Sequence, residues 1–288
     1  MKAKIKAKKY LIVIMSILSV VMLIPFVILV STSLKSMNDI QSSVFTFIPK
    51  QVVWHNFIDA MSRGNWLRYF WNTFFVTVVV VFFSLITNSL TGYAFARLRF
   101  RGRETLFVFT LIGFMIPPQV TMIPLFTVLK NFPLVGGNDI LGNGGIGFVN
   151  SYYALILPYI AGSFGVFMFR QFFMNFPEAL DDAARIDGLG RFKAFCLIYV
   201  PLSKPVFATL AVLKATQTWN EYTWPLVITN TDEMKTVQLA LTLFKTETDI
   251  QWNLLMAATL MISLPLIILF VFAQRYFVEG IVTTGLKN

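Results

Sequence analysis

Long apolar stretches follow one another along the chain and are separated by short polar segments. A helix of about 20 residues crosses a hydrocarbon core of about 30 Å, and these stretches approach or exceed that length with few charges. The pattern predicts an all-α polytopic membrane protein with six transmembrane helices, at about 11–30, 69–96, 105–129, 151–176, 203–228 and 254–277. Because these helices take up most of the 288 residues, we expect one transmembrane permeation domain covering 1–288.

Lysine and arginine are distributed unevenly between the two sides that this topology creates. With a cytoplasmic N-terminus, most of the 24 basic residues fall in the N-terminal segment, the loops after the second and fourth predicted helices, and the C-terminal tail. Cytoplasmic segments of membrane proteins carry such an excess. The asymmetry predicts that both termini are cytoplasmic. It also accounts for the net charge of +10 without a nucleic-acid partner.

Three features that could suggest other chemistry are better explained within a membrane protein. The first apolar stretch is longer than that of a typical secretory signal and lacks a cleavage site, so we expect it to remain as a helix. The single cysteine, Cys196, excludes an intrachain disulfide and has no companion ligands for a metal. The glycine-rich segment 131–150 lacks the G-x-x-x-x-G-K-S/T pattern of an ATP-binding loop. We therefore predict no cofactor and no metal on this chain, and an external loop whose core, 135–147, has no assigned role.

A polar segment lies between the fourth and fifth predicted helices, at 176–205. Pro177 suits the first turn of a helix, and Gly188 can adopt the left-handed conformation that ends one. Residues at helical spacing form a narrow face of mostly small side chains that another protein could approach closely: Leu180, Ala183, Ala184 and Asp187. The pattern predicts a short docking helix at about 177–188.

The same segment resembles the cytoplasmic EAA loop of ABC importer permeases. The match consists of Glu178, the run Asp182-Ala183-Ala184-Arg185-Ile186-Asp187-Gly188, then Ile198, Val200-Pro201-Leu202 and Pro205. The leading glutamate of the family pattern is Asp182 here, which keeps the charge and shortens its reach. The resemblance implies that a separate ATPase docks on this loop as on a coupling helix, through Glu178, Asp181, Asp182, Ala183, Ala184, Arg185, Asp187 and Gly188.

Further segments across nearly the whole chain are similar to the carbohydrate-uptake branch of ABC permeases, in particular the smaller, six-helix subunit of the maltose-type pair. They include Tyr93-Ala94-Phe95-Ala96-Arg97, Met115-Ile116-Pro117, Trp219-Asn220-Glu221 and Gln274-Arg275-Tyr276-Phe277. The resemblance implies a type I importer permease, not an enzyme, that imports sugars such as di- or oligosaccharides by alternating access.

The resemblance also implies the rest of the assembly. It would contain a second homologous permease subunit, giving a heterodimer, and two ATPase subunits that bind ATP and Mg. An extracellular or periplasmic solute-binding protein would deliver the cargo, and membrane lipid would surround the permeases. The expected location is the bacterial cytoplasmic (inner) membrane.

The fifth predicted helix carries a polar cluster. Ionisable groups within a bilayer are costly and usually face a cavity or one another. Lys214 and Glu221 are seven positions apart, which would place them on nearly the same face of a helix. This face could line the translocation path, or it could brace the partner subunit and the outer gate; both readings stay open. The candidate residues are Lys214, Gln217, Trp219, Asn220, Glu221 and Trp224.

The last predicted external loop covers 229–253. In the similar subunit this loop reaches the binding protein, which implies contact residues Lys235, Thr236, Leu243, Phe244 and Lys245. The alternative is an ordinary connecting loop.

Two other functions compete with sugar import. A permease for another solute, such as glycerol phosphate esters, would share every motif quoted above, although an anionic cargo would favour cationic residues on the path and only Lys214 qualifies. An integral membrane enzyme would need an intramembrane constellation of His, Asp or Glu, and the only ionisable candidates there are Lys214 and Glu221.

Overall fold

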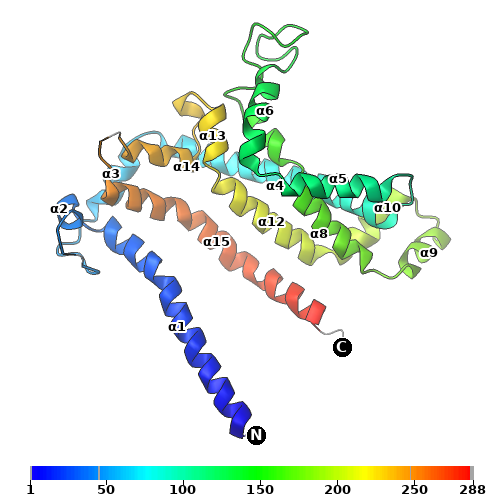
Figure 1. Ribbon diagram of the computed structural model, residues 1–288, viewed down its shortest axis with the longest axis horizontal. Helices are drawn as coiled ribbons and strands as arrows, with labels where there is room; N and C mark the ends of the chain where they lie inside the picture. Colours follow the sequence, from blue (N-terminus) through cyan, green and yellow to red (C-terminus); the bar gives the residue numbers. More distant parts are fainter. Residues whose placement is uncertain (1, 45, 247, 286–288) are drawn as a thin grey trace. The chain divides into compact units, whose positions relative to one another are not determined.

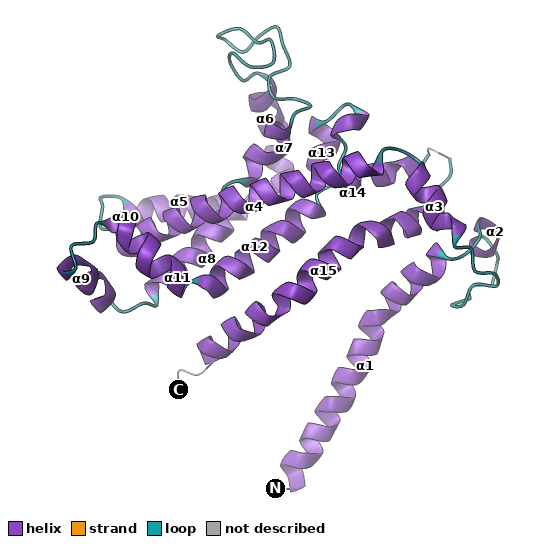
Figure 2. Cartoon of the chain, turned by 180° about the vertical axis from the view of Figure 1, so that it is seen from behind, coloured by secondary structure: helices purple, strands orange, loops and turns teal. Residues whose placement is uncertain are grey.

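The computed structural model describes residues 2–44, 46–246 and 248–285. Helices dominate this part of the chain (Figures 1 and 2). The described residues form no β-strand, and their β pairing is confined to an isolated bridge between Lys245 and Ile250. The all-α prediction is therefore confirmed.

Three long helices are apolar enough to cross a membrane by length and composition. They are α1 (Lys2–Ser33), α4 (Trp66–Arg97) and α15 (Trp252–Gly285). The stretches of these helices that meet the criterion are Lys9–Ser33, Trp66–Arg97 and Trp252–Gln274. They correspond to the first, second and sixth predicted spans, and each extends beyond the predicted limits at its N-terminal end.

The other three predicted spans are broken helices. In the third, α5 (Arg103–Met115) and α6 (Pro118–Lys130) are bent by 103° at Ile116 and Pro117. Since Pro118 follows directly, the two prolines remove backbone donors and favour extended geometry before them.

The fourth span is made of α7 (Tyr152–Ile156), the 3₁₀ turn η1 (Leu157–Tyr159) and α8 (Ser163–Met174), with a bend of 40°. The fifth is made of α10 (Arg191–Ala194), the π-helical turn η2 (Phe195–Tyr199), α11 (Val200–Leu202) and α12 (Lys204–Trp219), with a bend of 80°. The described residues thus offer three spans, or up to six if each bent pair crosses as one.

The fifth span also ends earlier than predicted. Helix α12 stops at Trp219, and a separate short helix, α13 (Thr223–Ile228), follows it. The predicted continuous helix 203–228 is wrong in this respect. The sequence could not reveal the break, because the intervening residues are neither glycine nor proline.

Two compact units make up the chain. The first contains Met1–Trp66 and Ala240–Leu264, and the second contains Leu67–Leu239 and Pro265–Asn288. Helix α15 contributes to both. The remaining short elements are α2 (Met37–Ile40), α3 (His55–Ser62), α9 (Ala179–Ile186), η3 (Asp232–Met234), α14 (Val237–Ala240) and η4 (Leu241–Phe244).

Buried amides and aromatic rings hold the first unit together. The Asn56 side chain donates to the carbonyl oxygens of Ser33 and Lys35, at 2.9 Å each. The Trp66 indole stacks on Phe244, with ring centroids 6.2 Å apart. Pairing of this kind satisfies the buried polar groups of loops that have no helical partners.

The second unit has two main apolar clusters. One includes Val80, Leu155 and Ile228, and the other is an aromatic cluster of Tyr93, Phe169, Phe173, Phe195 and Tyr199 with Val206 and Leu210. Beside the aromatic cluster, α4 and α8 approach closely at Gly92, where an added Cβ would lie 2.5 Å from Cβ of Phe169. The aromatic cluster lies next to the predicted docking segment and therefore supports it.

The glycine-rich segment is a compact coil. Oδ1 of Asp139 accepts hydrogen bonds from the backbone N–H groups of Leu141 and Asn143, at 2.8 Å each. The N–H of Phe148 donates to the carbonyl oxygen of Leu129 at 2.9 Å, so the two ends of the segment meet.

Candidate functional site

The predicted docking segment forms the eight-residue helix α9, which begins two residues after Pro177. Gly188 ends it with φ of +70°, as the sequence predicts. The N–H of Leu189 donates to the carbonyl oxygen of Ala184 at 2.8 Å, and the N–H of Gly188 donates to that of Arg185 at 3.0 Å. These two bonds form a Schellman motif, which satisfies carbonyl groups at the helix end. The helix thus has a fixed end although it is short.

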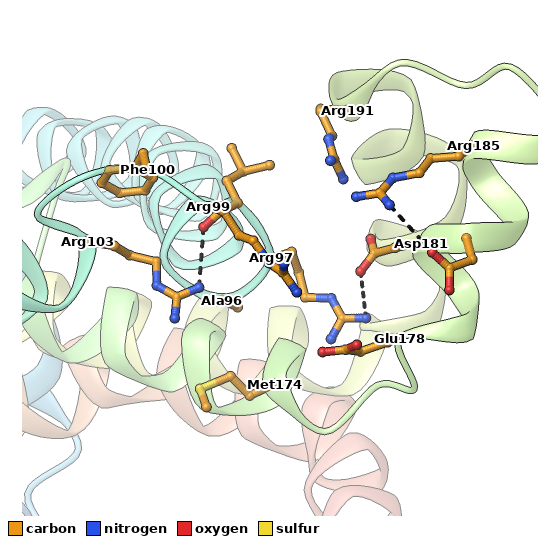
Figure 3. A pocket seen from close by; sticks show the side chains of 12 residues that line it. Ala96, Arg97, Arg99, Phe100, Arg103, Met174, Glu178, Asp181, Arg185 and Arg191 are labelled. Atoms are coloured by element: carbon orange, nitrogen blue, oxygen red, sulfur yellow. Dashed lines mark hydrogen bonds and ion pairs between the residues drawn. The ribbon is translucent and has the colours of Figure 1, made fainter.

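Asp181 holds this helix to the rest of the second unit (Figure 3). Its Oδ2 lies 2.9 Å from a terminal nitrogen of Arg97, the last residue of α4. Its Oδ1 accepts a hydrogen bond of 2.9 Å from the hydroxyl of Tyr199. The side chains of Arg97 and Asp181 are only 6% and 15% exposed. Asp181 therefore serves as an internal anchor of α9, and its role as a contact to another subunit stays a prediction.

Arg97 connects four groups at once. Besides Asp181, it donates to the carbonyl oxygens of Phe176 and Pro177, at 3.0 and 2.9 Å, and its Nε donates to the hydroxyl of Tyr199 at 2.8 Å. The fork of N–H groups on arginine is suited to such multiple bonding. We call Arg97, Asp181 and Tyr199 the latch. It joins the end of α4, the start of α9 and the π-helical turn η2.

The opposite side of α9 is free to meet another protein. Asp182, Ala183 and Arg185 are exposed, and Ile186 is 86% exposed. Asp182 and Arg185 form an ion pair of 3.5 Å with both side chains more than half exposed. Such a pair contributes little stability, about 0–1 kcal/mol, so either group can exchange its partner at small cost.

The predicted docking residues therefore divide into two groups. The exposed ones are Glu178, Asp182, Ala183, Arg185, Asp187 and Gly188. Asp181 is bound inside the latch, and Ala184 is buried at 3% exposure. Ala184 contacts this chain and does not form part of an approach surface. Sequence reasoning missed the roles of Arg97 and Tyr199. Arg97 stood out only as a basic residue and as the last residue of the family-like segment Tyr93-Ala94-Phe95-Ala96-Arg97.

The pathway candidates are spread over α12 and the chain that follows it. Lys214 lies on α12 opposite the break before α8: an added Cβ on Gly162 would be 3.4 Å from its Nζ. Among the residues that the structure describes, Lys214 has no hydrogen-bond or ion-pair partner. The fully buried Asn88 accepts a hydrogen bond of 3.0 Å from the N–H of Gly162 and so fixes the break.

Glu221 does not share a helix face with Lys214, because α12 ends before it. Its Oε1 accepts a hydrogen bond of 3.0 Å from the N–H of Trp224, near the start of α13. A carboxylate at this position stabilises free N–H groups and the positive end of a helix. The expectation of a common stripe is therefore wrong.

Two of the predicted pathway residues are packing residues. Trp219 is 6% exposed and packs near Phe70, and Trp224 is 4% exposed and donates from its indole to the carbonyl oxygen of Ala154 at 2.8 Å. Gln217 and Asn220 are exposed, and Oδ1 of Asn220 accepts a bond of 3.0 Å from Gln238. Trp219 and Trp224 thus pack within this chain, whereas Lys214 and Gln217 remain pathway candidates.

Most residues expected to meet a binding protein are not on the surface. Thr236 and Phe244 are 5% and 1% exposed, and Leu243 is half-buried. Lys235 forms an ion pair of 2.9 Å with Asp232. Lys245 is exposed and remains a candidate. The prediction for Thr236 and Phe244 is wrong in this structure, because apolar packing and backbone turns use those side chains internally.

The Lys235–Asp232 pair belongs to a group of polar contacts that holds residues 232–235 to α4. Hydrogen bonds from Lys235 and from the hydroxyl of Tyr69 lower the pKa of Asp232. The Asn72 amide donates to the carbonyl oxygens of Glu233 and Lys235, at 2.8 Å each. This part of the loop is therefore fixed by its own chain.

Known proteins agree with this architecture. Residues 88–283 match the family described as "Binding-protein-dependent transport system inner membrane component". An arabinooligosaccharides transport system permease protein of Halalkalibacterium halodurans is 34% identical over 267 residues, covering 92% of this chain and 91% of the relative. An sn-glycerol-3-phosphate transport system permease protein of Brucella abortus is 32% identical, covering 75% and 73%.

A solved structure shows the same fold. It is that of a bacterial ABC transporter involved in the import of the acidic polysaccharide alginate, with a TM-score of 0.79 and 21% identity over 96% of this chain and 98% of that one. The family match covers more than half of the chain, including α8, the latch, α9 and α12. This chain therefore belongs to the inner membrane components of binding-protein-dependent transport systems, as a permease subunit of an ABC importer and not an enzyme.

Proposed function

We propose that this chain forms the translocation path for a sugar, such as a di- or oligosaccharide, together with a second, homologous permease subunit. Two separate ATPase subunits bind ATP and Mg and dock on α9 of this chain and its counterpart. An extracytoplasmic binding protein delivers the cargo. Both termini lie in the cytoplasm of a bacterial cell, as the distribution of basic residues indicates.

The observation that carries this proposal is the two-sided character of α9. One side is fixed by the buried latch, and the other exposes Asp182, Ala183, Arg185 and Ile186. A helix that is anchored on one side can transmit a displacement applied on the other. Binding of ATP to the docked subunits need only favour one of two arrangements of the permease, because a ligand shifts an equilibrium through its differential affinity.

The docking part of the proposal is tested with neighbouring cysteines. In a Cys196→Ser background, Ala183→Cys places a thiol on the exposed side of α9, and Ala184→Cys places one on its buried side. With the assembled importer and a reagent that joins a thiol to a lysine amine, we expect Ala183→Cys to cross-link to the ATPase. Ala184→Cys, its matched control, should give little product. Equal yields, or product at position 184 alone, would contradict docking through this face.

Relatives support two classes of cargo. Sugar import is supported by the arabinooligosaccharide permease and by the alginate importer fold. A glycerol phosphate ester is the second candidate, since the Brucella abortus relative is named for one and Lys214 is a cation without a partner among the described residues. A hydroxyl-rich neutral cargo requires donors and acceptors such as Gln217, whereas an anionic cargo requires a charge.

Transport by the assembled importer in proteoliposomes distinguishes the two cargoes. We expect arabinooligosaccharides, supplied with the cognate binding protein, to stimulate ATP hydrolysis and to accumulate inside, while glycerol 3-phosphate does neither. Lys214→Gln should then leave sugar import within about twofold, because a neutral cargo forms no ion pair with it. Uptake of glycerol 3-phosphate that is lost in Lys214→Gln would favour the second candidate.

A further inference from the structure

A cavity of about 650 Å³ lies between the turn that follows α4 and the coupling helix α9 (Figure 3). Residues 96–100 and Arg103 form one wall, and Met174, α9 and Arg191 form the other. In Figure 3 the guanidinium groups of Arg185 and Arg191 point toward Asp181 from one side, with Phe100 and Arg103 across the opening. The latch thus lies at the edge of this cavity, and Asp182 and Arg185 of the proposed docking face also line it.

The charged groups that line this cavity are five arginines and three carboxylates. Two pairs neutralise one another, Arg97 with Asp181 and Arg185 with Asp182. A third arginine, Arg103, is paired with Glu104 outside the cavity.

The guanidinium groups of two other lining arginines are not neutralised in this way. Within the described part of the chain, the side chains of Arg99 and Arg191 have neither a hydrogen bond nor an ion pair, and Glu178 is the one lining carboxylate outside an ion pair. The cavity therefore keeps a positive charge. Guanidinium groups bind phosphate oxygens with short, charge-assisted hydrogen bonds, which makes an anionic phosphate group the fitting ligand.

The cavity also has an apolar part. Ala96, Phe100 and Met174 line it, and Phe100 and Met174 are 42% and 49% exposed. It begins where α4, a helix apolar enough to cross a membrane, ends. A soluble phosphate would leave the apolar wall in water, whereas the glycerol and upper acyl groups of a phospholipid would cover it. Basic pockets on the cytoplasmic side of membrane helices can hold anionic lipid headgroups in this way.

We propose that this cavity binds the phosphate of an anionic phospholipid, with Arg99 and Arg191 as its ligands. The proposal takes from the proposed function only that the turn after α4 faces the cytoplasmic leaflet. A bound lipid would connect that turn to the chain after α9 and would support the latch from outside. The membrane composition would then affect how firmly the coupling helix is held.

The test measures phosphatidylglycerol bound to the intact importer. The complete assembly is placed in phosphatidylcholine nanodiscs with increasing phosphatidylglycerol, and retained lipid is counted by native mass spectrometry. Each arginine near an anionic surface contributes the equivalent of about fivefold in affinity, so the double variant Arg99→Gln, Arg191→Gln should weaken binding about 25-fold. The matched control is Arg101→Gln, Lys193→Gln, which removes two exposed charges of the same segments that do not line the cavity. The control should bind as the unaltered importer does.

Three outcomes would overturn the proposal. Equal loss of bound phosphatidylglycerol in the double variant and its control would show that the lipid is attracted by surface charge in general and not by this cavity. Displacement of the lipid by inorganic phosphate at comparable concentration would show a soluble-anion site. Unchanged lipid together with weaker association of the ATPase in the double variant would show that the cavity receives the ATPase. Because cross-linking at Ala183→Cys is measured separately, failure of the lipid site leaves the docking proposal standing.

Discussion

Replacing Arg97 by alanine should uncouple the importer. The substitution leaves the carboxylate of Asp181 in a largely buried position and removes the donors to the carbonyl oxygens of Phe176 and Pro177. Loss of one partner of a buried ion pair costs about 3–5 kcal/mol, and 3 kcal/mol corresponds to a factor of about 100 in the population of the held helix. We expect sugar import in proteoliposomes to fall by at least about tenfold. Hydrogen exchange in 179–188 should become correspondingly faster.

Two variants distinguish loss of the latch from a general loss of structure as the cause of reduced import. Arg97→Lys keeps a charge near Asp181 but loses the multiple bonds of the guanidinium, so its import should be intermediate. Arg101→Ala removes an exposed charge from the same turn and should behave as the unaltered protein. If Arg97→Ala imported sugar normally and exchange in 179–188 were unchanged, the latch would have no role in coupling.

Replacing Gly92 should destabilise the second unit. An added Cβ would lie 2.5 Å from Cβ of Phe169 and 3.0 Å from the backbone nitrogen of Arg170. Neither neighbour can turn away by changing a rotamer, so α4 and α8 must separate. Overpacking of this kind costs about 1–3 kcal/mol, which should lower the melting temperature of the purified permease assembly by several degrees for Gly92→Ala and further for Gly92→Leu.

The matched control for this prediction is Gly190→Ala. Gly190 has a φ of −67°, and no atom lies within 4 Å of an added Cβ. Its replacement changes only the N-cap residue of the short helix α10, which costs about 0.5–1 kcal/mol. Equal melting temperatures for Gly92→Leu and Gly190→Ala would show that α4 and α8 do not pack tightly at Gly92.

The close approach at Gly92 also positions a second arginine. Arg170 follows Phe169 on α8, forms an ion pair of 2.9 Å with Glu104, and places its guanidinium 3.9 Å from the ring centre of Phe107. A shift of α8 would move this group away from α5. Gly92→Leu should therefore also weaken the contacts that Arg170 makes with Glu104 and Phe107 of α5.

The apolar pattern predicted the helical fold because each crossing needs a long stretch without charges, and such stretches are visible directly in sequence. The breaks inside three of them were harder to predict. Pro117 and Pro118 are a clear local signal for the bend between α5 and α6. Pro205, in the first turn of α12, is a local signal for a helix that begins after Ser203.

The coupling helix could be located from the sequence, but its two sides could not be assigned. Asp181 and Asp182 are adjacent and chemically alike, and neighbouring positions on a helix point about 100° apart. Which of the two faces inward depends on Arg97 and Tyr199, which come from distant parts of the sequence. A pattern of local spacing carries no information on such long-range partners.

The roles of Trp219, the last residue of α12, and Trp224, in α13, could not be assigned from the sequence for a related reason. Trp219 and Trp224 were considered for the path because aromatic faces suit sugar rings, yet both are buried. Composition alone does not tell an aromatic residue that meets a cargo from one that fills a core. The exposure of Gln217 and the position of Lys214 become known only from the packing of α12 near Gly162.

The glycine-rich coil 131–150 begins and ends at the same place, where the N–H of Phe148 donates to the carbonyl oxygen of Leu129. A segment closed in this way can grow, shrink or be exchanged without changing the distance that the flanking helices α6 and α7 have to span. The length of the coil thus has no influence on how α6 and α7 are placed. The sequence and length of this coil can therefore change while the helices of the permease stay as they are.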